Sequence, residues 1–180
     1  VINSMNLKSN QILVSVAAGI SFEQLEHYVG VKMPMFRVVP NTAIAYMESM
    51  TLVAGQNATE EQDKMILDIF NEMGMALLIP ESQIPATTAL ASCGIAFVLK
   101  YIQAAMQAGI EMGIYPKQAQ MMITQTVKGA AELLLNDPST HPSVEIDKVT
   151  TPGGITIKGI NELDHNGFTS AVIKAMKACK

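Results

Sequence analysis

The run T-P-G-G-I-T, from Thr151 to Thr156, combines residue types that could hold a negatively charged ligand. Pro152 fixes one backbone angle, and the two glycines after it leave one surface of the backbone bare. A helix is expected to start directly after the glycines, so its first amides would point outward where the helix dipole favours an anion. The pattern fits a carboxylate or a phosphate, and it fits equally well a helix-entry turn that binds nothing.

Two other segments are candidates because each lies at the carboxyl end of a predicted strand. S-V-A-A-G contains Ala17 and Ala18, and V-P-N-T contains Asn41. In open α/β sheets ligands bind outside the carboxyl ends of strands, and the Asn41 side chain offers both a donor and an acceptor. For V-P-N-T a plain Pro-Asn turn is the alternative interpretation.

The histidines and cysteines do not predict a metal site or a nucleophile. The three histidines, His27, His141 and His165, are far apart and have no partners at metal-ligand spacing, so no metal is expected. Cys93 lies in an apolar run, which predicts a buried, inert thiol. With Cys179 as the only other cysteine, and without a secretory pattern, we expect reduced thiols in a cytoplasmic protein.

The composition indicates that this chain buries apolar surface against another chain. Hydrophobic residues make up 49% of the 180 residues and charged residues only 16%. The net charge is −4 without a basic cluster, so nucleic acid is not an expected partner. The most apolar run, 84–99, is shorter than the roughly 20 residues that cross a bilayer, so a membrane is not expected either. The first residue is not methionine, and we interpret the chain as part of a longer protein.

Up to residue 81, strands and helices alternate, which predicts an α/β domain with a largely parallel sheet. Ser21 and Thr59 are expected to cap the two helices, and Gly74 to end the second. The expected strands are 11–19, 35–42, 49–55 and 76–80, and the expected helices are 21–29 and 59–74.

Residues 82–180 predict an all-α domain. Residues 84–113 are apolar on almost every face, and a helix of that kind must be buried on all sides. A helical domain of about 100 residues would hardly bury it alone, so an intertwined helical dimer is expected. The further expected helices are 116–135, 156–163 and 168–179, with a short turn at 141–149.

In chain order, S-V-A-A-G, R-V-V-P-N-T-A and H-P-S-V-E-I-D-K-V-T-T-P-G-G-I-T-I-K-G-I-N-E-L, followed by N-G-F, resemble pyrroline-5-carboxylate reductase. The resemblance covers essentially the whole chain, and Val149–Leu163 is its most specific block. It implies an oxidoreductase of proline biosynthesis that reduces 1-pyrroline-5-carboxylate to L-proline with NADP or NAD as the cofactor. The implied fold is the C-terminal part of a Rossmann-type sheet followed by a helical dimerisation domain, as a homodimer often assembled into decamers.

The resemblance also implies roles for single residues. Thr156 would hydrogen-bond the ring nitrogen of the substrate as the catalytic residue, and the turn around it would hold the substrate carboxylate. The cofactor would lie along Ala17, Ala18 and Asn41. The implied substrate-binding set is Thr151, Gly153, Gly154, Ile155 and Thr156.

Three departures from the family pattern leave alternatives open. The family's opening strand and glycine-rich phosphate loop are missing, so we expect this chain to be inactive or nearly so by itself, and the sequence leaves NADH or NADPH preference open. Ala91–Phe97 reads A-S-C-G-I-A-F instead of S-G-S-G-P-A-Y, and Ala43 replaces a proline. The alternatives are a related dehydrogenase of another small carboxylate, for which Lys100 lacks the lysine motif, and a non-catalytic dimerisation module.

Overall fold

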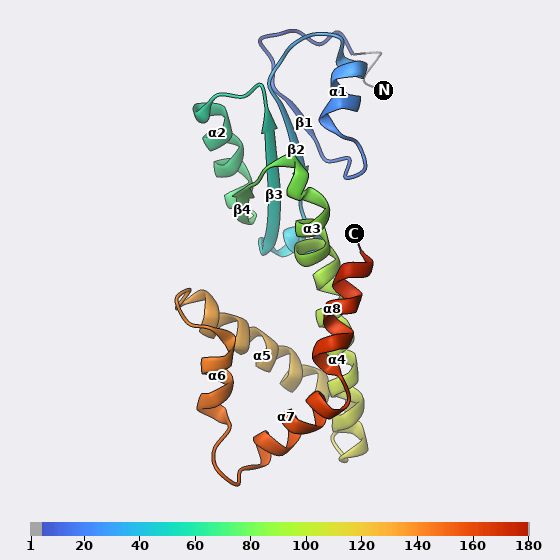
Figure 1. The fold of residues 1–180 in the computed structure, drawn as a ribbon, viewed down its shortest axis with the longest axis vertical. Coiled ribbons are helices and arrows are strands. Elements are labelled where there is room, and N and C mark those ends of the chain that lie inside the picture. Colours follow the sequence, from blue (N-terminus) through green and yellow to red (C-terminus); the bar gives the residue numbers. More distant parts are fainter. Residues whose placement is uncertain (1–4, 180) are drawn as a thin grey trace. The chain divides into compact units, whose positions relative to one another are not determined.

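The computed structural model describes residues 5–179, drawn in Figure 1. The chain forms two compact units, which are described separately: Val1–Ile95 with Met176–Lys180, and Ala96–Ala175. The change in composition that led us to separate 1–81 from 82–180 lies at Glu81. The first compact unit continues beyond that point to Ile95.

The first unit is built on a mixed four-stranded sheet in the order β1-β2-β3-β4. Its strands are β1 (Leu13–Ser15), β2 (Met35–Val39), β3 (Ser49–Gln56) and β4 (Gly74–Leu78). β1 and β2 are parallel, as are β3 and β4, which agrees with the expected parallel character. β2 and β3 are antiparallel, because only the short 3₁₀ helix η2 (Thr42–Tyr46) and its flanking residues connect them.

Both helix starts predicted in this unit are confirmed. Ser21 and Thr59 cap α1 (Phe22–Val29) and α2 (Glu60–Asn71), each in a capping box with a glutamine. Gly74, predicted to stop the second helix, instead opens β4 with a φ of 133°. A side chain there would collide with the backbone of Ser49, its partner on β3, so the close pairing of these strands requires glycine.

The core of this unit lies on both faces of β2, where every residue is buried. Met35 and Val39 face one cluster, and Phe36 and Val38 face the other, as alternation along a strand requires. The first cluster receives Phe22 and Leu25 of α1, and the second receives Ile66 of α2. Arg37 lies between Phe36 and Val38, so its side chain starts on the face of α1.

The segment after the sheet is one long helix with a change of winding. It consists of η3 (Glu81–Gln83), α3 (Ile84–Thr88), the π-helical η4 (Ala89–Cys93) and α4 (Gly94–Glu111). Glu81–Glu111 is long and apolar enough, by length and composition, to cross a membrane, and 11% of its most apolar window is buried. The length argument that we made for residues 84–99 does not extend to the whole helix, so the absence of a membrane partner stays a prediction.

The remaining helices, which Figure 1 shows in tan through orange to red, are α5 (Pro116–Leu135), α6 (Pro142–Val149), α7 (Ile155–His165) and α8 (Phe168–Ala178). The expected bounds of α5 are confirmed. The turn expected at 141–149 is wrong, because α6 forms there. The His141 side chain accepts a hydrogen bond from the Ser143 amide, and Pro142 occupies the first helical position, so the segment carries its own start signal.

Candidate functional site

The T-P-G-G turn connects α6 with α7 and is exposed. The Gly154 amide donates to the Thr151 carbonyl oxygen at 2.9 Å, which closes the turn. Gly153 has a φ of 71°, in the left-handed region that glycine adopts without strain. Gly154 then serves as the N-cap of α7 in an extended conformation.

Gly154 also leaves room for the Thr151 side chain. A Cβ atom on Gly154 would lie 2.6 Å from Thr151 Oγ1 and 3.0 Å from the Thr151 carbonyl oxygen. The Thr151 hydroxyl therefore rests against the Gly154 Cα, directly before the first turn of α7.

The start of α7 has no side-chain cap. Ile155 is 87% exposed and Thr156 is also exposed, so the first amides of the helix are open to a ligand. With the dipole of an eleven-residue helix behind them, these amides favour a carboxylate or a phosphate. Thr151, Gly153, Gly154, Ile155 and Thr156 thus lie together at an open helix start, and their binding of an anion stays a prediction.

The predicted cofactor residues lie in the first unit, at one edge of the sheet. β1 and β2 are parallel neighbours, so the loop after Ser15 and the segment after Val39 leave the sheet at the same edge. Ala17–Ile20 form a β-turn closed by the Ile20 amide on the Ala17 carbonyl oxygen at 3.1 Å. The expected placement of Ala17, Ala18 and Asn41 at strand ends is confirmed.

Asn41 is buried, at 7% exposure, and hydrogen-bonded on both sides of its amide. Its Nδ2 donates to the Ala91 carbonyl oxygen at 3.0 Å, and its Oδ1 accepts from the Ala43 amide at 2.9 Å. Each amide atom keeps one further hydrogen-bond position, so a cofactor contact from Asn41 remains chemically available and stays a prediction.

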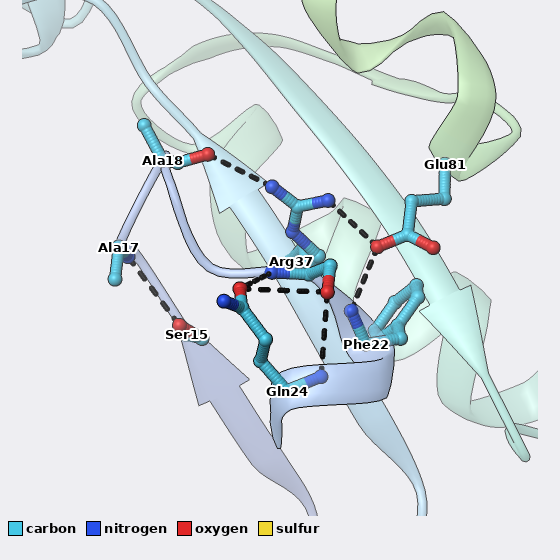
Figure 2. Close-up of polar contacts among 8 residues, drawn as sticks. Ser15, Ala17, Ala18, Phe22, Gln24, Arg37 and Glu81 are labelled. Atoms are coloured by element: carbon cyan, nitrogen blue, oxygen red, sulfur yellow. Dashed lines mark hydrogen bonds and ion pairs between the residues drawn. The ribbon is translucent and has the colours of Figure 1, made fainter. Parts of the chain in front are cut away.

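Sequence reasoning missed an ion pair beside the predicted cofactor loop. Figure 2 shows the Arg37 guanidinium between Ala18 and Glu81. Nη1 donates to Glu81 Oε1 at 2.7 Å, and Nη2 donates to the Ala18 carbonyl oxygen at 2.8 Å. Glu81 Oε1 also accepts from the amide of Phe22, the first residue of α1, at 2.8 Å. The only signal in the sequence is one arginine inside the apolar run M-F-R-V-V.

Arg37 carries its charge in a nearly closed environment. The residue is 8% exposed, and among the described residues its Nε has no hydrogen-bond partner. A buried charge is tolerated when it is paired, and Glu81 supplies the pairing carboxylate from the start of η3.

Comparison with known proteins agrees with this architecture. The family described as pyrroline-5-carboxylate reductase dimerisation matches residues 81–180. Pyrroline-5-carboxylate reductase 1 of Dictyostelium discoideum is 40% identical over 95% of this chain and 33% of its own length. The pyrroline-5-carboxylate reductase of Arabidopsis thaliana is 36% identical over 96% of this chain and 62% of its own length. The chain thus spans between one third and two thirds of these two relatives.

Two solved structures have the same fold over most of this chain. The Plasmodium falciparum pyrroline carboxylate reductase with NADP bound gives a TM-score of 0.86 at 29% identity, covering 95% of this chain and 69% of that one. The 1-pyrroline-5-carboxylate reductase of Streptococcus pyogenes gives 0.86 at 33% identity, covering 94% of this chain and 65% of that one. The family match, the related sequences and the shared fold together show that this chain belongs to the pyrroline-5-carboxylate reductase family.

Proposed function

We propose that the protein containing this chain reduces 1-pyrroline-5-carboxylate to L-proline with NADPH or NADH, as the last step of proline biosynthesis. The observation that carries this proposal is the intact T-P-G-G-I-T turn, whose helix start is open and uncapped. A vestigial turn would be free to lose the glycines that its geometry needs at Gly153 and Gly154.

The turn would bind the carboxylate of the substrate. The Ile155 amide, with the Thr151 hydroxyl, would donate to its oxygens at the positive end of α7, whereas the Gly154 amide would first have to release the Thr151 carbonyl oxygen. A carboxylate accepts such charge-assisted hydrogen bonds well. Binding at this end fixes the orientation of the ring, which is where positioning contributes to catalysis.

Thr156 lies one residue further into α7 and would reach the ring nitrogen through Oγ1. The hydroxyl can accept a hydrogen bond from the protonated imine nitrogen and can donate one to the unprotonated nitrogen. Its role is to hold the imine group in one orientation.

The cofactor would lie along Ala17, Ala18 and Asn41, and it supplies the hydride. The residues present suit it: the Ala17–Ile20 turn is exposed, and a Cβ built on Gly19 would meet no atom within 4 Å. The cofactor could therefore come close to the backbone of this turn at Gly19.

The partner that we propose is a second copy of this chain, with further assembly up to a decamer. Many large apolar side chains on the helices are exposed, including Leu90, Val98, Leu99 and Met121. A surface of this kind marks an interface. Nucleic acid is not proposed as a partner, because the net charge is −4. A membrane is not proposed either, because the second copy of the chain would cover the apolar helix. The proposed location is the cytoplasm, where Cys93 and Cys179 would stay free thiols.

A related dehydrogenase with a catalytic lysine is less well supported. Lys100 Nζ donates to Gln103 Oε1 at 2.8 Å, on an exposed part of α4. This hydrogen bond ties the lysine to its own helix, away from the T-P-G-G turn in sequence. No geometry in the described residues gives Lys100 a role in proton transfer.

The direct test is NADPH or NADH oxidation by the full-length protein in the presence of 1-pyrroline-5-carboxylate. Thr156→Ala should lower kcat/KM by about tenfold, as expected for losing one hydrogen bond to the reacting group. Thr126→Ala on α5 is the matched control, since the exposed Thr126 hydroxyl donates, among the described residues, only to the Met122 carbonyl oxygen of its own helix. A wild-type protein without this activity would overturn the proposal, and unchanged kinetics of Thr156→Ala would overturn the role of that residue.

A further inference from the structure

The Ala17–Ile20 turn presents two free amides in a row. Its closing hydrogen bond uses the Ala17 carbonyl and the Ile20 amide, and the Ala17 amide donates to Ser15 Oγ at 3.3 Å. Within residues 5–179, the amides of Ala18 and Gly19 have no hydrogen-bond partner. All three turn residues before Ile20 are exposed, so these two donors are open to a ligand.

The orientation of the Gly19 amide depends on the Ala18 carbonyl. The two groups belong to one peptide unit, which is planar and trans, so the N–H points opposite to the C=O. Nη2 of the nearly buried Arg37 donates to the Ala18 carbonyl oxygen at 2.8 Å, and Figure 2 shows this hydrogen bond. The Gly19 amide is thereby turned away from Arg37, toward the exposed side.

The guanidinium is itself fixed by Glu81. Glu81 Oε1 accepts both from Arg37 Nη1 and from the Phe22 amide, so one carboxylate holds the arginine and the first residue of α1. The loop before Phe22 is consequently held at two points, at Ala18 by Arg37 and at the helix start by Glu81. Neither residue needs to touch a ligand to have this effect.

We propose that Arg37 and Glu81 are positioning residues that orient the Ala18–Gly19 peptide so that the Gly19 amide donates to an oxygen of the dinucleotide. This inference rests on the proposed function, because it assigns the Ala17–Ile20 turn to the cofactor. The two residues act through the turn, so they change the affinity for the cofactor and leave the substrate turn of α7 unaffected.

The test uses steady-state kinetics of the full-length protein with the cofactor and the substrate varied separately. Arg37→Met should raise KM for NADPH or NADH by about tenfold, the effect of one lost hydrogen bond, while kcat at saturating cofactor stays within about twofold. Arg37→Lys should recover part of the loss, because its ammonium can still donate to the Ala18 carbonyl oxygen. Glu81→Ala should raise the cofactor KM as well, because it removes the acceptor that fixes both Arg37 Nη1 and the Phe22 amide.

Ile66→Val is the control for an effect of reduced stability on the cofactor KM. It weakens the core on the other face of the sheet and leaves the Ala17–Ile20 turn unchanged. The inference is overturned when Arg37→Met leaves the cofactor KM unchanged, or when Ile66→Val raises it equally. If Arg37→Met does not fold, Arg37→Lys decides by the same readout. A wild-type protein without NAD(P)H-dependent reduction would mean that the proposed function fails, whereas an active wild type with unaffected variants means that only the positioning role fails.

Discussion

Asn41 Nδ2 donates to the carbonyl oxygen of Ala91 at 3.0 Å, across 50 positions of sequence. The bond joins the end of β2 to the π-helical η4, where the wider winding alters the backbone hydrogen-bond pattern of the long helix. The same asparagine receives the Ala43 amide on Oδ1. One buried side chain therefore fixes both the strand end and the helix segment opposite it.

Asn41→Asp should lower the free energy of unfolding by about 1–3 kcal/mol, the cost of leaving a buried polar group unsatisfied. The carboxylate keeps the acceptor for the Ala43 amide but cannot donate to Ala91. Asn166→Asp is a matched control, because the exposed Asn166 amide donates to the Glu162 carbonyl oxygen at the end of α7. Urea denaturation of both variants is the measurement. Equal losses in the free energy of unfolding would show that the hydrogen bond to Ala91 contributes no more than an exposed one.

The Arg37–Glu81 pair predicts an asymmetric response to its two deletions. Glu81→Ala leaves the nearly buried Arg37 charge without its carboxylate and should cost about 2–3 kcal/mol. Arg37→Met should cost about 1 kcal/mol, because the side chain of Glu81 is 35% exposed, remains hydrated and still accepts from Phe22. Urea unfolding with a double-mutant cycle measures both losses. A larger loss of stability in Arg37→Met than in Glu81→Ala would contradict the argument from the burial of Arg37.

The two cysteines, predicted from sequence to be unpaired thiols, approach each other in the first unit. A hydrogen bond with Cys93, and then desolvation, raise the pKa of the Cys179 thiol above its usual value of 9.0. The adjoining Gly94 lies 4.0 Å, measured from an added Cβ, from the Met176 methyl group one turn before Cys179. Both observations place the end of α8 against η4.

Cys179 should therefore react with iodoacetamide more slowly than an ordinary exposed cysteine at pH 8, because less of it is thiolate. Its rate should rise at a higher pH than that of a model thiol, and Cys93→Ala should move the profile back toward lower pH. Because the folded-state pKa of Cys179 is raised, the protonated thiol stabilises the fold at pH values below the unfolded-state pKa. This stabilisation is lost as the pH rises through the folded-state pKa. A profile that Cys93→Ala does not move would contradict the contact.

Local signals in the sequence predicted most elements, whereas contacts between distant residues could not be predicted. The Ser21 and Thr59 caps and Pro116 act within one helical turn, so pattern alone located α1, α2 and α5. α6 was missed because His141 is an uncommon N-cap and acts together with Pro142. The Arg37–Glu81 pair spans 44 positions, and no local pattern connects the two residues.

Gly19→Ala tests the proposed cofactor loop independently of the positioning residues. Gly19 is not in the left-handed region, and an added methyl group would meet no atom within 4 Å, so stability should change by less than about 0.5 kcal/mol. If a dinucleotide approaches the Gly19 amide closely, the methyl group should raise the cofactor KM about tenfold without lowering the melting temperature. An unchanged KM would place the cofactor away from this turn.

Gly154 of the T-P-G-G turn and Gly159 inside α7 should respond in opposite ways to substitution by alanine. Gly154→Ala would bring a methyl group to 2.6 Å from Thr151 Oγ1, so the turn must open and the Thr151 hydroxyl must leave its place. Gly159→Ala meets no atom within 4 Å in the helix interior and should raise the free energy of unfolding by about 0.5–1 kcal/mol, because alanine is the better helix former. In the full-length protein, Gly154→Ala should raise KM for 1-pyrroline-5-carboxylate about tenfold or more, while Gly159→Ala leaves it unchanged. Urea titrations measure the change in the free energy of unfolding of each variant, and steady-state kinetics measure the substrate KM. An unchanged substrate KM in Gly154→Ala would show that the turn does not bind the substrate.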